Sequence, residues 1–171
     1  SSLVLLGFIF SWNGFCYTTE QISSVTTSDE AQVENLRTQE LNQLRIVMGR
    51  RFSESRKPDV LLRMAELYVE RYRFYFFKEN QVHQKQYQSG QKPRSVNHDL
   101  SKQALHSATN ACLAILKSRV PFARIDQVYY FLGFNAEEMG KRSEATKYFN
   151  MVVTKYPRSA YASESYRNLA E

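Results

Sequence analysis

The stretch from Ile125 to Pro157 carries two apolar patterns with the 3.6-residue spacing of an α-helix, one on each side of a short turn. The first pattern places Tyr129, Leu132 and Ala136 on one helix face, and the second places Ala145, Phe149 and Val152 on one face. Gly133 and Ala145 are small enough to let the two helix axes approach closely. Gly140 stands where the first helix should end and suits a C-terminal cap. The stretch therefore predicts a closely packed helix-turn-helix unit.

The spacing of the first of these helices occurs twice more in the chain. Leu61, Met64, Ala65 and Tyr68 repeat the separations of Tyr129, Leu132, Gly133 and Ala136, and Tyr166, Leu169 and Ala170 repeat them again. Pro121 and Pro157 stand at the ends of the first two units. We predict a first unit over 57–121, a second over 122–158 and the start of a third over 159–171.

The set Tyr129, Leu132, Gly133, Ala145, Phe149 and Pro157 resembles the signature of the tetratricopeptide repeat (TPR) family, with Ala136 where that signature usually has Tyr. Two further features resemble those of periplasmic and outer-membrane-associated TPR proteins of Gram-negative bacteria. They are the 37-residue step from Leu132 to Leu169 and the link from Tyr156 to Ala162. The resemblance implies an all-α fold. Its helix-turn-helix repeats would stack as a right-handed superhelix, an α-solenoid, with an additional N-terminal helix.

The same resemblance implies a binding groove lined by the first helix of each repeat. The matching positions are Gln127, Tyr130, Phe134, Glu137 and Glu138 in the second unit and Asp59, Leu62, Glu66 and Glu70 in the first. Tyr130 and Phe134 are four residues apart, so we expect one aromatic strip beside two carboxylates. Such a strip suits a peptide with an apolar and a basic side chain. The alternative is that these aromatics pack against the run from Phe74 to Phe77.

An uncharged apolar run from Leu3 to Phe10 lies near the start of the chain. It is too short to span a bilayer and matches the core of a signal peptide. Gly14 and Cys16 are small at the two positions that precede a cleavage site. We therefore predict a signal peptide over 1–16 and export to the periplasm. The alternatives are an uncleaved anchor and an ordinary buried segment, and membrane association is expected only through such an anchor or a partner.

Residues 17–27 are rich in Ser, Thr and Gln, and we expect a flexible spacer there. Ser28 is a suitable N-cap for a helix over 28–56. The apolar positions of this helix are Val33, Leu36, Leu41, Leu44, Val47 and Met48. Their spacing fits a helix that covers the open face of the repeats, or alternatively a short coiled-coil seam.

The first unit differs from the second because its helices are separated by a long polar segment. We predict that residues 78–97 are an insertion between these two helices. They should form an exposed loop or a frayed extension of the preceding helix. Five aromatic residues, Tyr72, Phe74, Tyr75, Phe76 and Phe77, precede it. They cannot all face one core, so some should contact a neighbouring helix or form a ridge for a partner.

The composition fits a soluble globular protein, with 43% hydrophobic and 23% charged residues among 171. The net charge of +6 is spread along the chain, and the densest basic run, from Arg50 to Lys57, is interrupted by Phe52, Glu54 and serines. This run favours a solvated helix end over a nucleic-acid site. Cys112 lies among apolar residues and is expected to act as a small buried hydrophobe.

No phosphate-binding glycine loop, CxxC pair, HExxH motif or serine elbow occurs in the sequence. His83 and His98 have no acidic or cysteine companion at ligand spacing, so no metal or cofactor is expected. The sequence therefore predicts a non-catalytic scaffold or adaptor that binds an envelope protein or peptide. The alternatives are a self-assembling structural module, which would form a homo-oligomer, and the targeting arm of an enzyme whose catalytic domain lies beyond residue 171.

Overall fold

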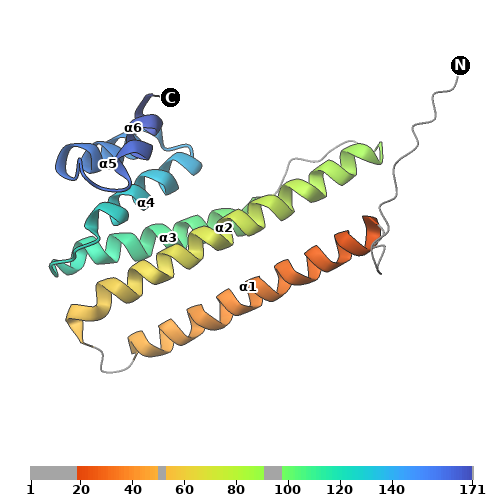
Figure 1. Cartoon of the computed structure of the whole chain (residues 1–171), viewed down its shortest axis with the longest axis horizontal. Helices are drawn as coiled ribbons and strands as arrows, with labels where there is room; N and C mark the ends of the chain where they lie inside the picture. The colour runs from red at the N-terminus through yellow and green to blue at the C-terminus, as the bar shows by residue number, and fades with distance from the viewer. Residues whose placement is uncertain (1–18, 50–52, 91–97, 171) are drawn as a thin grey trace, which may run out of the picture. The chain divides into compact units, whose positions relative to one another are not determined.

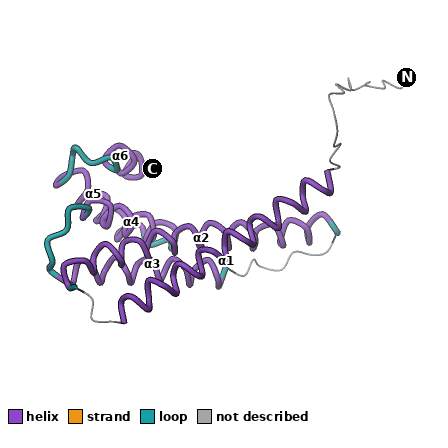
Figure 2. The backbone as a smooth tube through the Cα atoms, turned by 60° about the horizontal axis from the view of Figure 1, so that its bottom comes forward, coloured by secondary structure: helices purple, strands orange, loops and turns teal. Residues whose placement is uncertain are grey.

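A computed structural model describes the backbone of residues 19–49, 53–90 and 98–170, and the side chains from residue 29 onward. Within these ranges all regular structure is helical, which confirms the all-α class (Figure 1, Figure 2). The elements are α1 (Thr19–Gly49), a 3-10 turn η1 (Glu54–Arg56), α2 (Lys57–Gln88), α3 (Asp99–Ser118), α4 (Ile125–Glu138), α5 (Arg142–Lys155) and α6 (Ala162–Ala170). The chain divides into two compact units, Ser1–Val33 and Glu34–Glu171. The proposed signal peptide lies outside the described residues.

Two helices are longer than the sequence patterns indicated. The helix α1 begins at Thr19, so residues 19–27 are helical and the prediction of a flexible spacer there is wrong. The helix α2 continues to Gln88, so for residues 78–88 the alternative of a helix extension is correct and that of a loop is wrong. The reason is the same in both places: no Gly or Pro stands between Tyr17 and Met48, or between Asp59 and Ser89, and Ser, Thr and Gln lower helix stability only slightly. Gly90, with φ of 72°, follows α2.

The α4–α5 pair is held together by the small residues of the repeat pattern. Leu132, Ala136, Ala145, Phe149 and Val152 are all buried, with at most 4% of each exposed. A Cβ on Gly133 would lie 2.6 Å from Phe149 Cε1, so only glycine allows this close an approach. Gly140 has φ of 71°, and the next amide, that of Lys141, donates to Ala136 O at 2.8 Å. This glycine is the C-terminal cap of α4 that the sequence indicated.

The helices α2 and α3 form a second pair and run in opposite directions. Leu62 near the start of α2 packs with Cys112 and Ile115 near the end of α3. Tyr72, farther along α2, packs with Ala104 and Leu105. Cys112 is fully buried, as expected, and burial raises the pKa of its thiol to about 12.

The helix α4 lies against both helices of this pair. Val128 and Leu132 share a core with Cys112 and Ile115 of α3. Polar contacts join α4 to α2 in matching order: Arg124 reaches Asp59, Gln127 reaches Glu66, and Glu138 accepts a hydrogen bond from Tyr72. Because both residue numbers rise together, α2 and α4 run in the same direction.

The part of α1 from Glu34 onward contacts α2 mainly through charged side chains. Glu34 pairs with Arg71 at 2.6 Å, Arg37 with Glu70 at 2.9 Å, and Glu40 with Arg63 at 2.7 Å. Leu41 is the fully buried apolar residue in this part, where it joins Leu67, Tyr68, Val69 and Ala108. The coiled-coil alternative is weakened, because Leu41 and Leu44, which it required, pack within the chain.

The aromatic run of α2 divides between the interior and the surface. Tyr72 is buried, whereas Phe76 and Phe77 are 43% and 52% exposed. The ring of Phe76 stacks on His98 with 5.3 Å between centroids. No helix in the described ranges is long and apolar enough to cross a membrane.

Candidate functional site

The predicted groove residues of α2 and α4 meet at one polar contact. The amide of Gln127 donates from Nε2 to Glu66 Oε1 at 3.0 Å, and only 9% of Gln127 is exposed. The guanidinium of Arg63 donates from Nη1 to the other oxygen, Oε2, of Glu66 at 3.2 Å. The Glu66 carboxylate is therefore held on two sides and links α2 to α4.

A second contact at the start of α4 extends this arrangement toward solvent. Arg124 Nη2 lies 3.3 Å from Asp59 Oδ1, and Nη1 of the same guanidinium lies 3.7 Å from Glu66 Oε1. The side chains of Asp59 and Arg124 are about half exposed. An exposed ion pair of this kind contributes about 0–1 kcal/mol to stability, so it can open to engage a partner at little cost.

Tyr130 forms an aromatic stack with Tyr161, which precedes α6. Their ring centroids are 4.9 Å apart and their planes are inclined by 25°. Tyr130 also packs on the buried ring of Phe149, with 6.1 Å between centroids. Partial burial, with Glu164 nearby, raises the pKa of the Tyr130 phenol. The stack therefore joins α4, α5 and the start of α6 around one partly accessible pair of rings.

The position of Tyr161 is set by the turn before α6. Ser159 Oγ donates to Asp126 Oδ2 at 2.6 Å, and the Tyr161 amide donates to the same Ser159 oxygen at 3.1 Å. Partial burial, followed by the negative charges of Asp126 and Glu66, raises the pKa of the Tyr161 phenol. The Tyr161 ring thus lies close to Asp126 and to Glu66, the carboxylate that links α2 to α4.

Phe134 does not extend the aromatic surface of Tyr130 as the sequence indicated. Its ring lies edge-on to Tyr72 at 6.2 Å, and the Arg73 guanidinium sits 5.8 Å from its centroid. The Tyr72 hydroxyl donates to Glu138, which fixes this carboxylate beside α2. Phe134 therefore packs within the chain, but on Tyr72 and not on the run from Phe74 to Phe77 that the alternative named.

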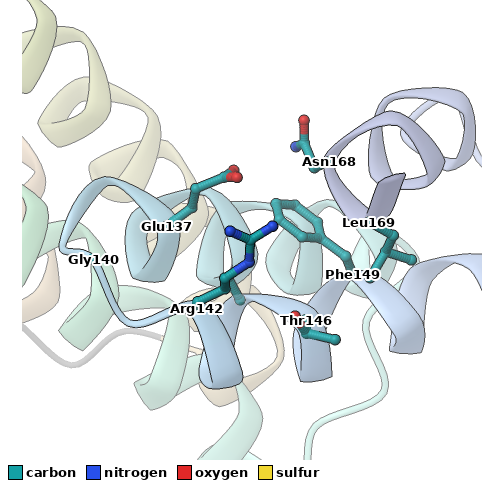
Figure 3. A pocket seen from close by; sticks show the side chains of 8 residues that line it. Glu137, Gly140, Arg142, Thr146, Phe149, Asn168 and Leu169 are labelled. Atoms are coloured by element: carbon teal, nitrogen blue, oxygen red, sulfur yellow. The ribbon is translucent and has the colours of Figure 1, made fainter. Parts of the chain in front are cut away.

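Glu137 lies two turns beyond Tyr130 on nearly the same side of α4. It lines a hollow of about 380 Å³ between the α4–α5 turn and α6, together with Arg142, Phe149 and Leu169. Figure 3 shows the side chains of Glu137 and Arg142 reaching toward the space beside the Phe149 ring. Glu137 and Glu138 thus serve different surfaces, which follows from their 100° separation around the helix.

Two predicted groove residues of α2 cannot form a free surface. Leu62 is fully buried in the core, so its assignment to the groove is wrong. Glu70 pairs with Arg37 of α1 at 2.9 Å, so it faces α1 and not α4. The structure therefore brings together Asp59, Glu66, Gln127 and Tyr130, and it separates Leu62, Glu70 and Phe134 from them.

The sequence interpretation missed three side chains on this surface, Arg124, Asp126 and Tyr161. We call the surface made by Asp59, Glu66, Arg124, Asp126, Gln127, Tyr130 and Tyr161 the tyrosine face. A signal for Tyr161 was present, because it belongs to the link between the second and third units. The sequence contained no signal for Arg124, because a single arginine before a helix is common.

The tyrosine face has the chemistry of a binding surface. It offers two partly exposed phenols, three carboxylates and one guanidinium, and tyrosine and arginine are both enriched in protein interfaces. Within the described residues, no group of three or more His, Cys, Asp or Glu is placed to hold a metal ion. Compared with protein-family models, curated proteins and solved structures, the chain matches none of them.

Proposed function

We propose that this chain is a non-catalytic scaffold of TPR type that binds a partner protein or peptide through the tyrosine face. The observation that carries the proposal is the order of the helices: α2 and α4 run in the same direction, and the start of α6 joins α4 through the Tyr130–Tyr161 stack. First helices of successive repeats line one surface in such an arrangement. The right-handed superhelix belongs to this proposal.

The proposed partner is a segment with a basic and an apolar side chain. The tyrosine face carries the carboxylates of Asp59, Glu66 and Asp126 against the single guanidinium of Arg124, which favours a basic partner. A cation could approach Asp126 and Glu66, and an apolar group could cover the two tyrosine rings. The rigid helices present these groups before binding, which limits the ordering cost of association.

The proposed compartment is the periplasm of a Gram-negative bacterium, where the partner would be another envelope protein. The support is the apolar run from Leu3 to Phe10 and the resemblance of the repeats to periplasmic TPR proteins.

The test is affinity capture from envelope extracts with the full chain and two tyrosine variants. Tyr161→Ala removes one ring of the stack and leaves Tyr130 packed on Phe149. Tyr166→Ala is the matched control, because Tyr166 is a 58% exposed tyrosine of α6 outside the tyrosine face. Capture that falls with Tyr161→Ala and not with Tyr166→Ala supports the proposal, provided that both variants keep their helical circular dichroism. Equal capture by all three proteins overturns it.

A further inference from the structure

A second hollow lies between α1, α2 and α3 and is lined mainly by polar side chains. Its volume is about 200 Å³, and Leu100 and Ala104 supply its apolar lining. The remaining lining residues all lie in the second unit and include no acid; they are Arg45, Tyr68, Arg71, Tyr75, Gln103 and Ser107. We call this site the arginine hollow. A hollow with two guanidiniums and no carboxylate in its lining favours a negatively charged occupant.

Arg71 is held in place by α1, and one of its nitrogens remains unused. Its Nε donates to Glu34 at 2.6 Å and its Nη2 donates to Thr38 at 2.6 Å. Within the described residues, Nη1 has no acceptor for its two N–H groups. Because 17% of this side chain is exposed, the guanidinium is largely shielded from water. Arg71 therefore offers a fixed pair of donors to a ligand in the hollow.

Arg45 carries a positive charge that no carboxylate of the described part of the chain neutralises. Its Nη1 donates to the side chain of Asn42 at 2.8 Å, and its Nη2 donates to the Tyr68 hydroxyl at 2.9 Å. A guanidinium has five N–H donors, so three of those of Arg45 remain for a ligand. Since Glu34 balances the charge of Arg71, Arg45 supplies the charge that attracts an anion.

The Tyr68 hydroxyl adds a donor at the floor of the hollow. Tyr68 is 8% exposed, and its oxygen already accepts the hydrogen bond from Arg45. Its own proton has no acceptor among the residues that the structure describes. A buried hydroxyl without an acceptor is unfavourable, and buried phenols usually find a partner. Tyr68, Arg45 and Arg71 thus bring unused donors to one hollow.

We propose that the arginine hollow binds a phosphate group, either inorganic phosphate or the phosphate of a small monoester. Hydrogen bonds from a guanidinium to a phosphate are short and strong, and the guanidinium geometry matches phosphate oxygens. The donors come from more than one helix. A tetrahedral phosphate directs its oxygens to several sides, whereas a carboxylate has two oxygens in one plane.

A bound phosphate should fasten α1 to the α2–α3 pair. Arg45 belongs to α1, Tyr68 and Arg71 to α2, and Gln103 to α3. A ligand that binds the folded arrangement stabilises it, so hydrogen exchange in α1 should slow when phosphate is added. The arginine hollow shares no residue with the tyrosine face, and its occupation does not depend on the proposed scaffold function.

The test is isothermal titration calorimetry of the full chain in a phosphate-free buffer at constant ionic strength. The probes are inorganic phosphate, glycerol phosphate and acetate. We expect the phosphate probes to bind at one site and at least about tenfold more tightly than acetate. The tighter of the two phosphate probes identifies the source of the group. A chain that binds neither phosphate probe at millimolar concentrations, or binds acetate equally well, overturns the proposal.

Two variants locate the bound phosphate. Arg45→Gln removes an exposed guanidinium, and Tyr68→Phe removes the hydroxyl while keeping the packed ring, so both should keep their helical circular dichroism. Each should weaken phosphate binding about tenfold, because each removes a hydrogen bond to a charged group. Phosphate should also slow hydrogen exchange in α1 less in Arg45→Gln than in the wild type.

The matched control is Arg158→Gln, which makes the same change in net charge at an exposed arginine before α6. It should bind phosphate like the wild type. If Arg45→Gln and Arg158→Gln bound phosphate with equal affinity, the phosphate would lie elsewhere on the basic surface and the proposal would be overturned.

Discussion

The Phe149 ring lies against the backbone of Gly133, so close that a Cβ at residue 133 would come within 2.6 Å of one ring carbon and 2.7 Å of the next. Phe149 is 1% exposed, so its ring belongs to the packed core of the α4–α5 pair. This contact brings α4 and α5 together and, through Tyr130, supports the tyrosine face.

We expect Gly133→Ala to destabilise the fold. Overpacking of a filled core costs about 1–3 kcal/mol, and the better helix propensity of Ala returns about 0.5–1 kcal/mol. The net loss in the free energy of unfolding should be about 1–2 kcal/mol by urea denaturation. Gly49→Ala is the control, because nothing lies within 4 Å of its added Cβ. If Gly133→Ala and Gly49→Ala had the same free energy of unfolding, α4 and α5 would be able to move apart to accommodate the added methyl group without loss of stability.

Glu79 of α2 holds the first turn of α3. Its Oε1 accepts hydrogen bonds from the amides of Leu100 at 3.1 Å and Ser101 at 3.3 Å, and its Oε2 lies 3.2 Å from His98 Nδ1. A carboxylate at a helix N-terminus both caps free amides and complements the helix dipole. Glu79→Gln removes the charge but keeps the shape, so we expect a loss of about 1–2 kcal/mol.

Hydrogen exchange is the sharper measurement for this variant. The amides of Leu100 and Ser101 should exchange faster in Glu79→Gln, while the first turn of α5 should be unchanged. Uniform acceleration over all helices would mean that Glu79 acts through global stability and not as a cap for α3.

The local parts of the fold could be predicted from the sequence because local residues determine them. Gly140 caps α4 through its own positive φ, and Gly133 permits the close approach that its small size suggested. Helix ends were less predictable. Without Gly or Pro, α1 and α2 continue through segments whose polar composition suggested a spacer in the first case, and a loop or a frayed helix extension in the second.

The candidate site was predictable only in part, because a helical pattern gives the direction of a side chain and not its neighbour. Tyr130 and Phe134 are about 40° apart around α4. Even so, Tyr130 turns to Tyr161 before α6, whereas Phe134 turns to Tyr72 of α2. That choice depends on the placement of α2 and α6, which the sequence of α4 does not contain.

Because Cys112 is buried, we expect the free energy of unfolding to decrease at alkaline pH. Burial raises the pKa of its thiol to about 12, whereas an unfolded cysteine ionises near pH 8.5. Between these values the unfolded state has lost a proton that the folded state keeps, so stability falls as pH rises. From pH 8 to pH 10 the loss attributable to Cys112 should be about 2 kcal/mol.

The measurement is urea denaturation of the wild type and Cys112→Ala at both pH values. The variant will be less stable at pH 8 because of the cavity, but its further loss on going to pH 10 should be smaller than that of the wild type. Buried tyrosines ionise equally in both proteins, so they cancel in the comparison. Parallel pH profiles would show that the thiol is not shielded from water.

Leu41 anchors α1 within a seam that otherwise consists largely of ion pairs. Its side chain is fully buried beside Leu67 and Tyr68, whereas the side chains of the Glu40–Arg63 pair remain about 40% exposed. Such pairs contribute about 0–1 kcal/mol each, and a buried Leu→Ala substitution costs about 2–5 kcal/mol. We therefore expect Leu41→Ala to release α1 from α2 before the rest of the second unit unfolds.

Hydrogen exchange should show this release as faster exchange in α1 with little change in α3, α4 and α5. Leu36→Ala is the matched control, because it removes an equal side chain from the exposed side of the same helix. It should leave exchange in α1 within error of the wild type. If Leu41→Ala instead accelerated exchange equally in all helices, α1 would be part of one cooperative core with α2, and its ion pairs would be stronger than their exposure suggests.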